Sequence, residues 1–163
     1  EYVGTDVIPD VCSKTKVLTS RYNKQIAIYC KPSEDLSKNK TFMKKYREHF
    51  DVVFFSPPYY KLEMYDSKNQ STTMYKTYNE WLEKYWRATV KLCKDVLNSG
   101  GYMCYILSGY GSEKGQNYNL IDDMNAITNE YFRPISIVPM FNKNVHATMH
   151  RDTGEKIILY KKP

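Results

Sequence analysis

Short apolar runs separated by helix-like stretches constrain the fold of this chain more than any other feature. The clearest is Asp51-Val52-Val53-Phe54-Phe55, a continuous apolar run of the kind expected for a strand buried on both faces of a parallel sheet. It ends abruptly at Ser56-Pro57-Pro58-Tyr59. Similar runs predict further strands over residues 2–6, 26–30, 102–107, 135–140 and 155–160.

Helix-like spacing fills most of the intervals between these runs. Residues 78–97 place Trp81, Leu82, Tyr85 and Trp86 near one broad apolar stripe, which predicts a long amphipathic helix with both tryptophans packed on the sheet. Asn98-Ser99-Gly100-Gly101 predicts its end, because glycine tolerates a left-handed C-terminal cap. Shorter helices are expected after Pro9 up to about residue 21, and over residues 41–50 and 118–132, whereas residues 61–76 and 108–117 are expected to be loops.

Alternating strands and helices predict one α/β domain over residues 1–163, built on a mostly parallel sheet with helices on both faces. Such sheets bind ligands beyond the carboxyl ends of their strands. Asp6, residues 32–35 and residues 56–59 all follow predicted strands, so they are expected to converge on one edge.

Composition sets the broad class of protein. The chain has 163 residues and 42% hydrophobic content, enough for one core, and no apolar run approaches the ~20 residues that span a bilayer. A net charge of +6 favours polyanionic partners such as nucleic acid, with an ordinary lysine-rich surface as the alternative. The wide spacing of Cys12, Cys30, Cys93 and Cys104 predicts buried reduced thiols in an intracellular protein, neither a zinc site nor a disulfide framework.

The tetrapeptide Ser56-Pro57-Pro58-Tyr59 carries a specific chemical logic. Each proline fixes its own φ and restricts the residue before it, so the loop is stiff. The Ser56 hydroxyl and the Pro57 carbonyl are acceptors, and Tyr59 offers an aromatic face. Two acceptors that grip the N–H groups of an aromatic amine would favour a pyramidal nitrogen, whose lone pair can attack a methyl sulfonium. Such a site works by orientation and electrostatics and requires no metal.

A base within a duplex must leave the stack before its amine can reach such a loop. An aromatic wall offsets part of that cost, since stacking of a base on an aromatic side chain is worth roughly 1–3 kcal/mol. Tyr59 is the predicted wall.

Residues 51–60 resemble the catalytic motif of the amino-methyltransferases, the adenine-N6 and cytosine-N4 DNA methyltransferases, whose pattern is Asp, Asn or Ser, then Pro-Pro, then Tyr, Phe or Trp. The likeness continues through Tyr78-Asn79-Glu80-Trp81-Leu82 and residues 96–107. Upstream, Tyr2-Val3-Gly4-Thr5-Asp6-Val7-Ile8-Pro9 is similar to the family stretch that ends one strand with an acid. The resemblance implies a Rossmann-like methyltransferase fold with S-adenosylmethionine as cofactor.

The resemblance also implies roles for individual residues. Asp6 would bind the cofactor ribose, and Ser33 and Glu34 lie where the family contacts the cofactor adenine. Ser56, Pro57, Pro58 and Tyr59 would form the catalytic loop. The family's glycine-rich cofactor loop is found at neither end of the chain. We therefore expect an excerpt of a longer protein that lacks its first strand and that loop, with a degenerate relative as the alternative.

The predicted activity is methyl transfer from S-adenosylmethionine to the N4 of cytosine or the N6 of adenine in DNA, with DNA favoured over RNA as the partner. Two alternatives stay open: an RNA methyltransferase acting on guanine N2 or adenine N6, and a catalytically silent domain used in binding or assembly.

Several residues have a simpler interpretation beside the functional one. Asp6 could merely cap the helix that follows it. His146 and His150 could hold a metal if helical, but a solvated loop is favoured because no third ligand is evident. Lys143, Arg151 and the loop over residues 61–76 could approach phosphate or belong to ordinary solvated surface.

Overall fold

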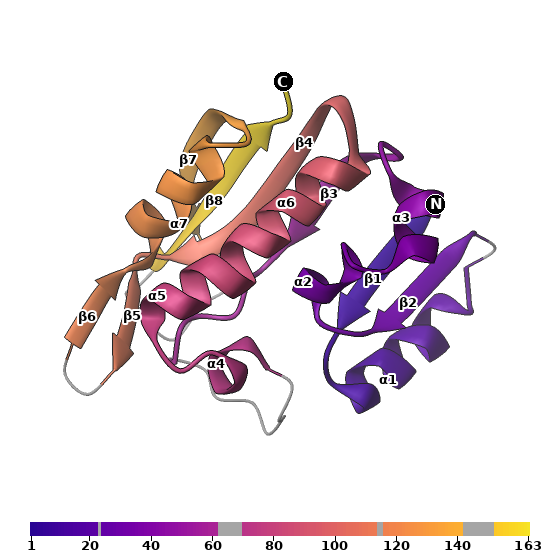
Figure 1. Ribbon diagram of the computed structural model, residues 1–163, viewed down its shortest axis with the longest axis horizontal. Helices are drawn as coiled ribbons and strands as arrows, with labels where there is room; N and C mark the ends of the chain where they lie inside the picture. Colours follow the sequence, from indigo (N-terminus) through magenta and orange to yellow (C-terminus); the bar gives the residue numbers. More distant parts are fainter. Residues whose placement is uncertain (23, 62–69, 114–115, 142–151) are drawn as a thin grey trace.

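The computed structural model describes all residues except 23, 62–69, 114–115 and 142–151. Its helices pack in a layer against strands that lie side by side (Figure 1). In chain order the elements are β1 Tyr2–Asp6, α1 Pro9–Thr19, β2 Ile26–Cys30, α2 Ser33–Leu36, α3 Lys40–Tyr46, β3 Phe50–Phe55, α4 Ser71–Met74, α5 Tyr78–Trp81, η1 Leu82–Trp86, α6 Arg87–Val96, β4 Leu97–Ser108, β5 Tyr110–Glu113, β6 Gln116–Asn119, α7 Leu120–Asn129, β7 Arg133–Phe141 and β8 Asp152–Lys161.

The described strands form three sheets: β1-β2, β3-β4-β8-β7 and the small hairpin β5-β6. The predicted α/β fold is confirmed, but the main sheet is mixed. β3 and β4 are parallel, whereas β8 is antiparallel to both β4 and β7. A parallel pair needs a long crossover, usually a helix. No helix is expected from the sequence between β7 and β8, which agrees with their antiparallel pairing.

The hairpin β5-β6 lies where the sequence predicts a loop. Backbone pairing joins Tyr110 to Asn119 and Glu113 to Gln116. Glycine and polar side chains dominate this stretch, so it lacks the apolar alternation that marks a half-buried strand. The prediction of a loop over residues 108–117 is therefore wrong.

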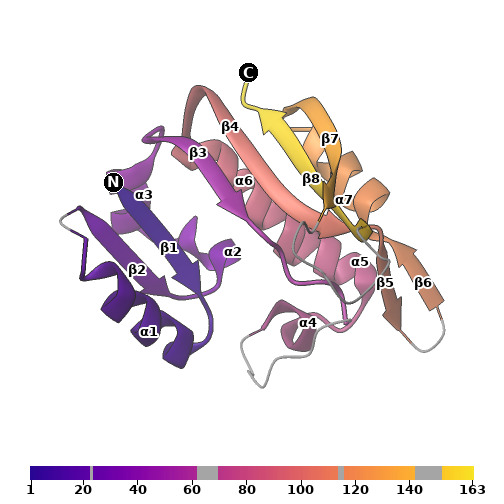
Figure 2. The ribbon, with the colours of Figure 1, turned by 180° about the vertical axis from the view of Figure 1, so that it is seen from behind.

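The expectation that β3 is buried on both faces is wrong for one of them. Val52 and Phe54 are 58% and 64% exposed, whereas Val53 and Phe55 pack against the core. β3 pairs with β4 and β1 pairs with β2, and each has no partner on its other edge among the described residues. Figure 2 shows β1 and β3 running in the same direction, with α6 behind the main sheet.

One continuous helical run, α5, η1 and α6, confirms the long helix predicted over residues 78–97. Its middle part, η1, is a π-helix, a wider turn than the α-helical geometry on either side. The run ends at Val96, and Leu97 is already extended. The left-handed glycine expected at the helix end is Gly100, which has φ +77°. It lies within β4, between the pairings Phe50–Leu97 and Val52–Tyr102, where the register with β3 shifts.

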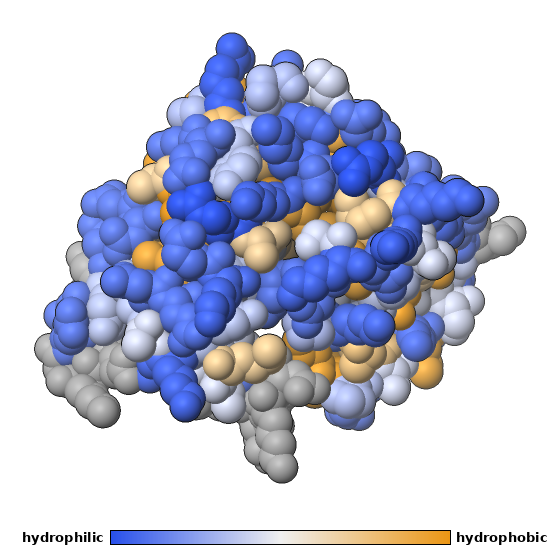
Figure 3. Space-filling model, viewed as in Figure 1, coloured by the Kyte–Doolittle hydropathy of each residue, from blue (hydrophilic) through white to orange (hydrophobic). Residues whose placement is uncertain are grey.

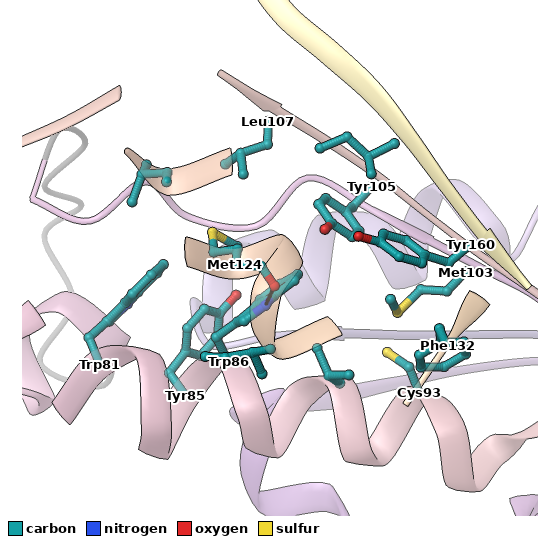
Figure 4. Packing of buried hydrophobic residues seen from close by; sticks show 14 of the residues in the cluster. Trp81, Tyr85, Trp86, Cys93, Met103, Tyr105, Leu107, Met124, Phe132 and Tyr160 are labelled. Carbon is teal, nitrogen blue, oxygen red and sulfur yellow. Dashed lines mark hydrogen bonds between the residues drawn. The ribbon is translucent and has the colours of Figure 1, made fainter. Parts of the chain in front are cut away.

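The larger core cluster lies between this helical run, α7 and the main sheet. Trp81 and Trp86 are fully buried, as predicted. The Trp86 indole N–H donates to the Met124 carbonyl at 2.9 Å, and its ring meets that of Tyr105 edge-on at 5.0 Å. Figure 4 shows Trp81, Tyr85 and Trp86 projecting from one helix into this cluster. The opposite side of the helical layer is mainly hydrophilic (Figure 3).

A second cluster connects the β1-β2 sheet to the main sheet. It is centred on Tyr46 and contains buried side chains of α2, α3 and α6, against which Val3 and Tyr29 pack from one sheet and Phe50 and Val53 from the other. The helix expected over residues 41–50 is shorter than predicted: it ends at Tyr46, because Arg47 is already extended, and Glu48 follows with φ 47° before β3 begins.

Other properties read from the sequence are also visible. All four cysteines are free; Cys12 and Cys93 are buried as expected, whereas Cys104 is half-buried and Cys30 is exposed. No helix in the described part of the chain is long and apolar enough to cross a membrane.

Candidate active site

The diproline loop leaves the carboxyl end of β3 and lies against the end of β4. Ser56 is exposed, and its hydroxyl donates to the Ile106 carbonyl at 3.4 Å. Because the hydroxyl proton is used in this way, the lone pairs of Oγ remain available as acceptors. Pro57 is buried and Pro58 is half-buried, so the stiff part of the loop is set into the molecule.

Tyr59 points into the core, with 6% of its surface exposed. The Ser108 N–H donates to its phenolic oxygen at 3.0 Å, and its hydroxyl donates to Oε1 of Glu155 at 3.1 Å. Burial raises the pKa of Tyr59, so the phenol stays protonated at neutral pH. The aromatic wall predicted for a base is thus a covered ring in this structure, and stacking on it requires its neighbours to shift.

Asp6 closes β1 and is half-buried. Its Oδ1 accepts a hydrogen bond from the Ile8 N–H at 2.8 Å, in the turn that leads into α1. One carboxylate oxygen therefore serves the local backbone, as the simpler interpretation of this residue expects. The other oxygen accepts no hydrogen bond from the residues that the structure describes, so it is available to a hydroxyl such as that of a ribose.

Ser33 and Glu34 lie on α2, against α6. The hydroxyls of Ser33 and Thr89 are 3.1 Å apart. Glu34 is 3% exposed, and its two oxygens accept from the hydroxyls of Tyr75, at 3.4 Å, and Ser33, at 3.5 Å. Burial raises the pKa of Glu34, and it also raises the pKa of Tyr75 to about 12. Both side chains predicted to meet the cofactor adenine are therefore bonded within the protein.

The predicted residues form separate groups in the structure. Ser56 and Tyr59 attach to β4, and Asp6 closes β1. Ser33 pairs with Thr89 of α6, and Glu34 accepts from Tyr75. Tyr75 and Lys76 connect the diproline loop to α2. The Tyr60 hydroxyl, next to the loop, donates to the Lys76 carbonyl at 3.5 Å, and the neighbouring Tyr75 donates to Glu34 on α2.

Sequence reasoning missed Glu155, Ser108 and Tyr75. Glu155 precedes an apolar run and reads as an ordinary polar residue at the start of a strand. Ser108 contributes its backbone N–H, and Tyr75 is one of sixteen tyrosines. No local pattern marks any of the three, since each acquires its role through a contact distant in sequence.

Two other features lie apart from this loop. No group of three metal-binding side chains occurs in the described parts of the chain, and His146, His150, Lys143 and Arg151 lie outside them. A shallow hollow on α1 is lined by Ser13, Lys14, Val17 and Leu18, none of which belongs to the candidate site.

Parallel strands that end in polar loops, with helices packed against them, define a Rossmann-like α/β fold. No family model and no curated protein matches the chain. Solved structures with a similar fold show which Rossmann-like proteins the chain resembles. A protein from Thermus thermophilus, a presumed DNA modification methylase, has a TM-score of 0.55 and 15% identity over 82% of this chain and 50% of its own. The same protein complexed with S-adenosyl-L-methionine has a TM-score of 0.53, at 13% identity over 82% of this chain and 54% of its own.

The N-methyltransferase NodS from Bradyrhizobium japonicum, in complex with S-adenosyl-L-homocysteine, has a TM-score of 0.58 and 13% identity, covering 99% of this chain and 66% of its own. The chain thus has the fold of S-adenosylmethionine-dependent methyltransferases. It spans about half the length of the Thermus protein and two thirds of NodS.

Proposed function

We propose that this chain is part of an S-adenosylmethionine-dependent methyltransferase that acts on an exocyclic amine of DNA, the N4 of cytosine or the N6 of adenine. The observation that carries the proposal is the diproline loop, which lies at the end of a parallel strand in a methyltransferase fold and is fastened to β4 through Ser56 and Tyr59. Its exposed hydroxyl is the chemical feature that a substrate amine would meet.

The loop's task is to orient the amine. The Ser56 hydroxyl, whose proton is directed to Ile106, and the Pro57 carbonyl would each accept one amine N–H. This favours a nitrogen lone pair that is aimed at the methyl carbon. A C–N bond forms as the C–S bond breaks with its electron pair on sulfur, and the nitrogen then releases a proton to solvent. The sulfonium cofactor supplies the methyl group, and the protein supplies position and electrostatics.

Three further residues would hold the cofactor. The carboxylate oxygen of Asp6 that no described residue bonds fits a ribose hydroxyl. Ser33 and Glu34 would serve the adenine after exchanging their present partners on α6 and Tyr75. The net charge of +6 supports a polyanionic substrate, and the presumed activity of the Thermus neighbour supports DNA in particular.

Methyl transfer from tritiated S-adenosylmethionine tests the proposal on the full-length protein. Unmethylated phage DNA and an RNA of mixed sequence serve as parallel substrates, and titration calorimetry measures cofactor binding. Label in DNA supports the proposal, label in RNA alone favours the RNA methyltransferase, and absence of cofactor binding favours the silent domain.

Ser56→Ala should lower kcat about 10–100-fold with little change in cofactor affinity, because one of two amine acceptors is lost. Ser99→Ala is the matched control: its hydroxyl donates to the Pro163 carbonyl, far in sequence from the loop, and activity should persist. Equal activity of both variants would contradict the role given to Ser56.

A further inference from the structure

The Tyr59 hydroxyl occupies a corner formed by two strands. Ser108 and Glu155 are opposite one another in the antiparallel register of β4 and β8. The Ser108 N–H donates to the phenolic oxygen at 3.0 Å, while the phenol donates to Oε1 of Glu155 at 3.1 Å. The hydroxyl is acceptor and donor at once, so both its position and its direction are restrained.

The hydrogen bonds of Tyr59 form one of two side-chain attachments that hold the diproline loop to the described strands. The other is the bond from Ser56 to the Ile106 carbonyl, two residues before Ser108 on the same strand. Between the attachments lie Pro57 and Pro58, whose φ angles are fixed, so the loop has little internal freedom. Its placement is therefore set by its two ends.

The two attachments differ in strength. The Ser56 bond is 3.4 Å long and the residue is exposed, whereas Tyr59 is buried and its two bonds are 3.0 and 3.1 Å. A hydrogen bond to an ionised carboxylate is roughly twice as strong as one between neutral groups. The Tyr59 end is therefore the firmer attachment.

We infer that Glu155 is a positioning residue, which holds Tyr59 and through it fixes the Ser56 hydroxyl and the Pro57 carbonyl. The catalytic consequence depends on the proposed function, but the restraint on the loop does not. An error of about 1 Å in the placement of reacting groups can cost about 100-fold in rate. Loss of the Glu155 carboxylate should therefore act on turnover more than on cofactor binding.

Four variants of the full-length protein test this: Glu155→Leu, Glu155→Gln, Tyr59→Phe and the double variant Glu155→Leu with Tyr59→Phe. With tritiated S-adenosylmethionine and unmethylated phage DNA, Glu155→Leu should lower kcat at least about 10-fold and change the KM for the cofactor less than about twofold. Glu155→Gln keeps an oxygen acceptor and should stay within about threefold of the natural protein. The double variant should be no slower than Tyr59→Phe alone, because both changes break one contact.

A second pair in the molecule provides a matched control. The Tyr78 hydroxyl donates to Oδ2 of Asp123 at 2.8 Å, a bond of the same chemistry between two residues outside the diproline loop. Asp123→Leu should change kcat less than about twofold. If Glu155→Leu and Asp123→Leu behave alike, or if Glu155→Leu slows the Tyr59→Phe protein further, the inference is wrong.

Hydrogen exchange at the Ser108 amide separates this inference from the proposed function. This amide donates to Tyr59, so its exchange should quicken at least about 10-fold in Glu155→Leu and little in Asp123→Leu. An inactive natural protein would refute the proposed function while the amide still reports on the restraint. Unchanged exchange in Glu155→Leu, or collapse of the fold in Glu155→Gln, would overturn the restraint itself.

Discussion

Glu34 is a buried carboxylate whose surroundings oppose its charge. It is 3% exposed, and the hydroxyls that donate to its two oxygens do so over the long distances of 3.4 and 3.5 Å. Burial raises its pKa above the ordinary 4.5, so the folded protein binds this proton more tightly than the unfolded chain. The stabilising contribution is complete below pH 4.5 and is lost as the pH rises through the raised value.

Glu34→Gln should therefore raise the melting temperature at about pH 8, because an amide carries no charge and still accepts from Tyr75. The gain should shrink as the pH falls toward 4.5. Glu130→Gln is a control in which the melting temperature at about pH 8 should fall, since Arg87 lowers the pKa of that exposed carboxyl. Thermal unfolding across this range measures both. A pH-independent difference for Glu34→Gln would contradict the explanation.

At this scale the sequence predicts the residues whose chemistry is local. Ser56, Pro57 and Pro58 lie at the end of a strand as expected, because an apolar run and a diproline are read within one short segment. The environments of Tyr59 and Glu34 could not be predicted, since Glu155 and Tyr75 reach them from 96 and 41 residues away.

The helical run that begins with α5 has a reciprocal N-terminal cap. The Glu80 N–H donates to Oγ1 of Thr77 at 3.2 Å, and the Lys76 N–H donates to the Glu80 carboxylate at 3.0 Å. These bonds satisfy backbone donors that have no partner within the helix. The run carries Trp81, Tyr85 and Trp86 into the core, so its start matters to the packing of the entire layer.

Thr77→Ala should lower the free energy of unfolding by about 1 kcal/mol, because the cap acceptor is lost. Thr77→Ser should have little effect, since serine keeps the oxygen. Thr41→Ala is a matched control, at an exposed position within α3, whose cap is Asn39. Urea unfolding measures all three. Equal free energies of unfolding for Thr77→Ala and Thr41→Ala would show that the Thr77 cap contributes nothing to stability.

The sequence predicts elements well where the pattern is dense. β1 and β2 have the predicted bounds, and the long helix is present almost throughout. The misses have physical causes. The hairpin β5-β6 consists of polar residues without periodicity. α3 ends early because Arg47 is extended and Glu48 is left-handed, and no neighbouring residue signals either conformation.

At the scale of the whole molecule, the edges of β1 and β3 that no described strand pairs are the main departure from the predicted single sheet. An unpaired strand edge beside exposed apolar side chains is a template for association with another chain. Val52 and Phe54 supply such side chains on β3. The sequence could not reveal this, because an apolar run looks the same whether one face is covered or both.

Phe54→Lys should reduce self-association of residues 1–163 while changing the free energy of unfolding by less than about 0.5 kcal/mol, because the side chain is exposed. Phe55→Lys is its opposite: that ring lies 6.0 Å from Trp86 and faces the core, so several kcal/mol should be lost. Sedimentation velocity over a concentration series, with thermal unfolding, measures both. If Phe54→Lys associates as strongly as the unchanged chain, the unpaired edge of β3 is not the surface through which the chains associate.

The buried indoles give the protein an intrinsic optical signal. The chain contains only two tryptophans; both lie in the helical run beside the diproline loop, and both indole N–H groups are bonded internally, to Ser71 and to Met124. Fluorescence excited at the red edge of the absorption band therefore comes from this one helix. A shift of its emission to longer wavelength would report the undocking of the helix, without any label and ahead of any loss in total helicity.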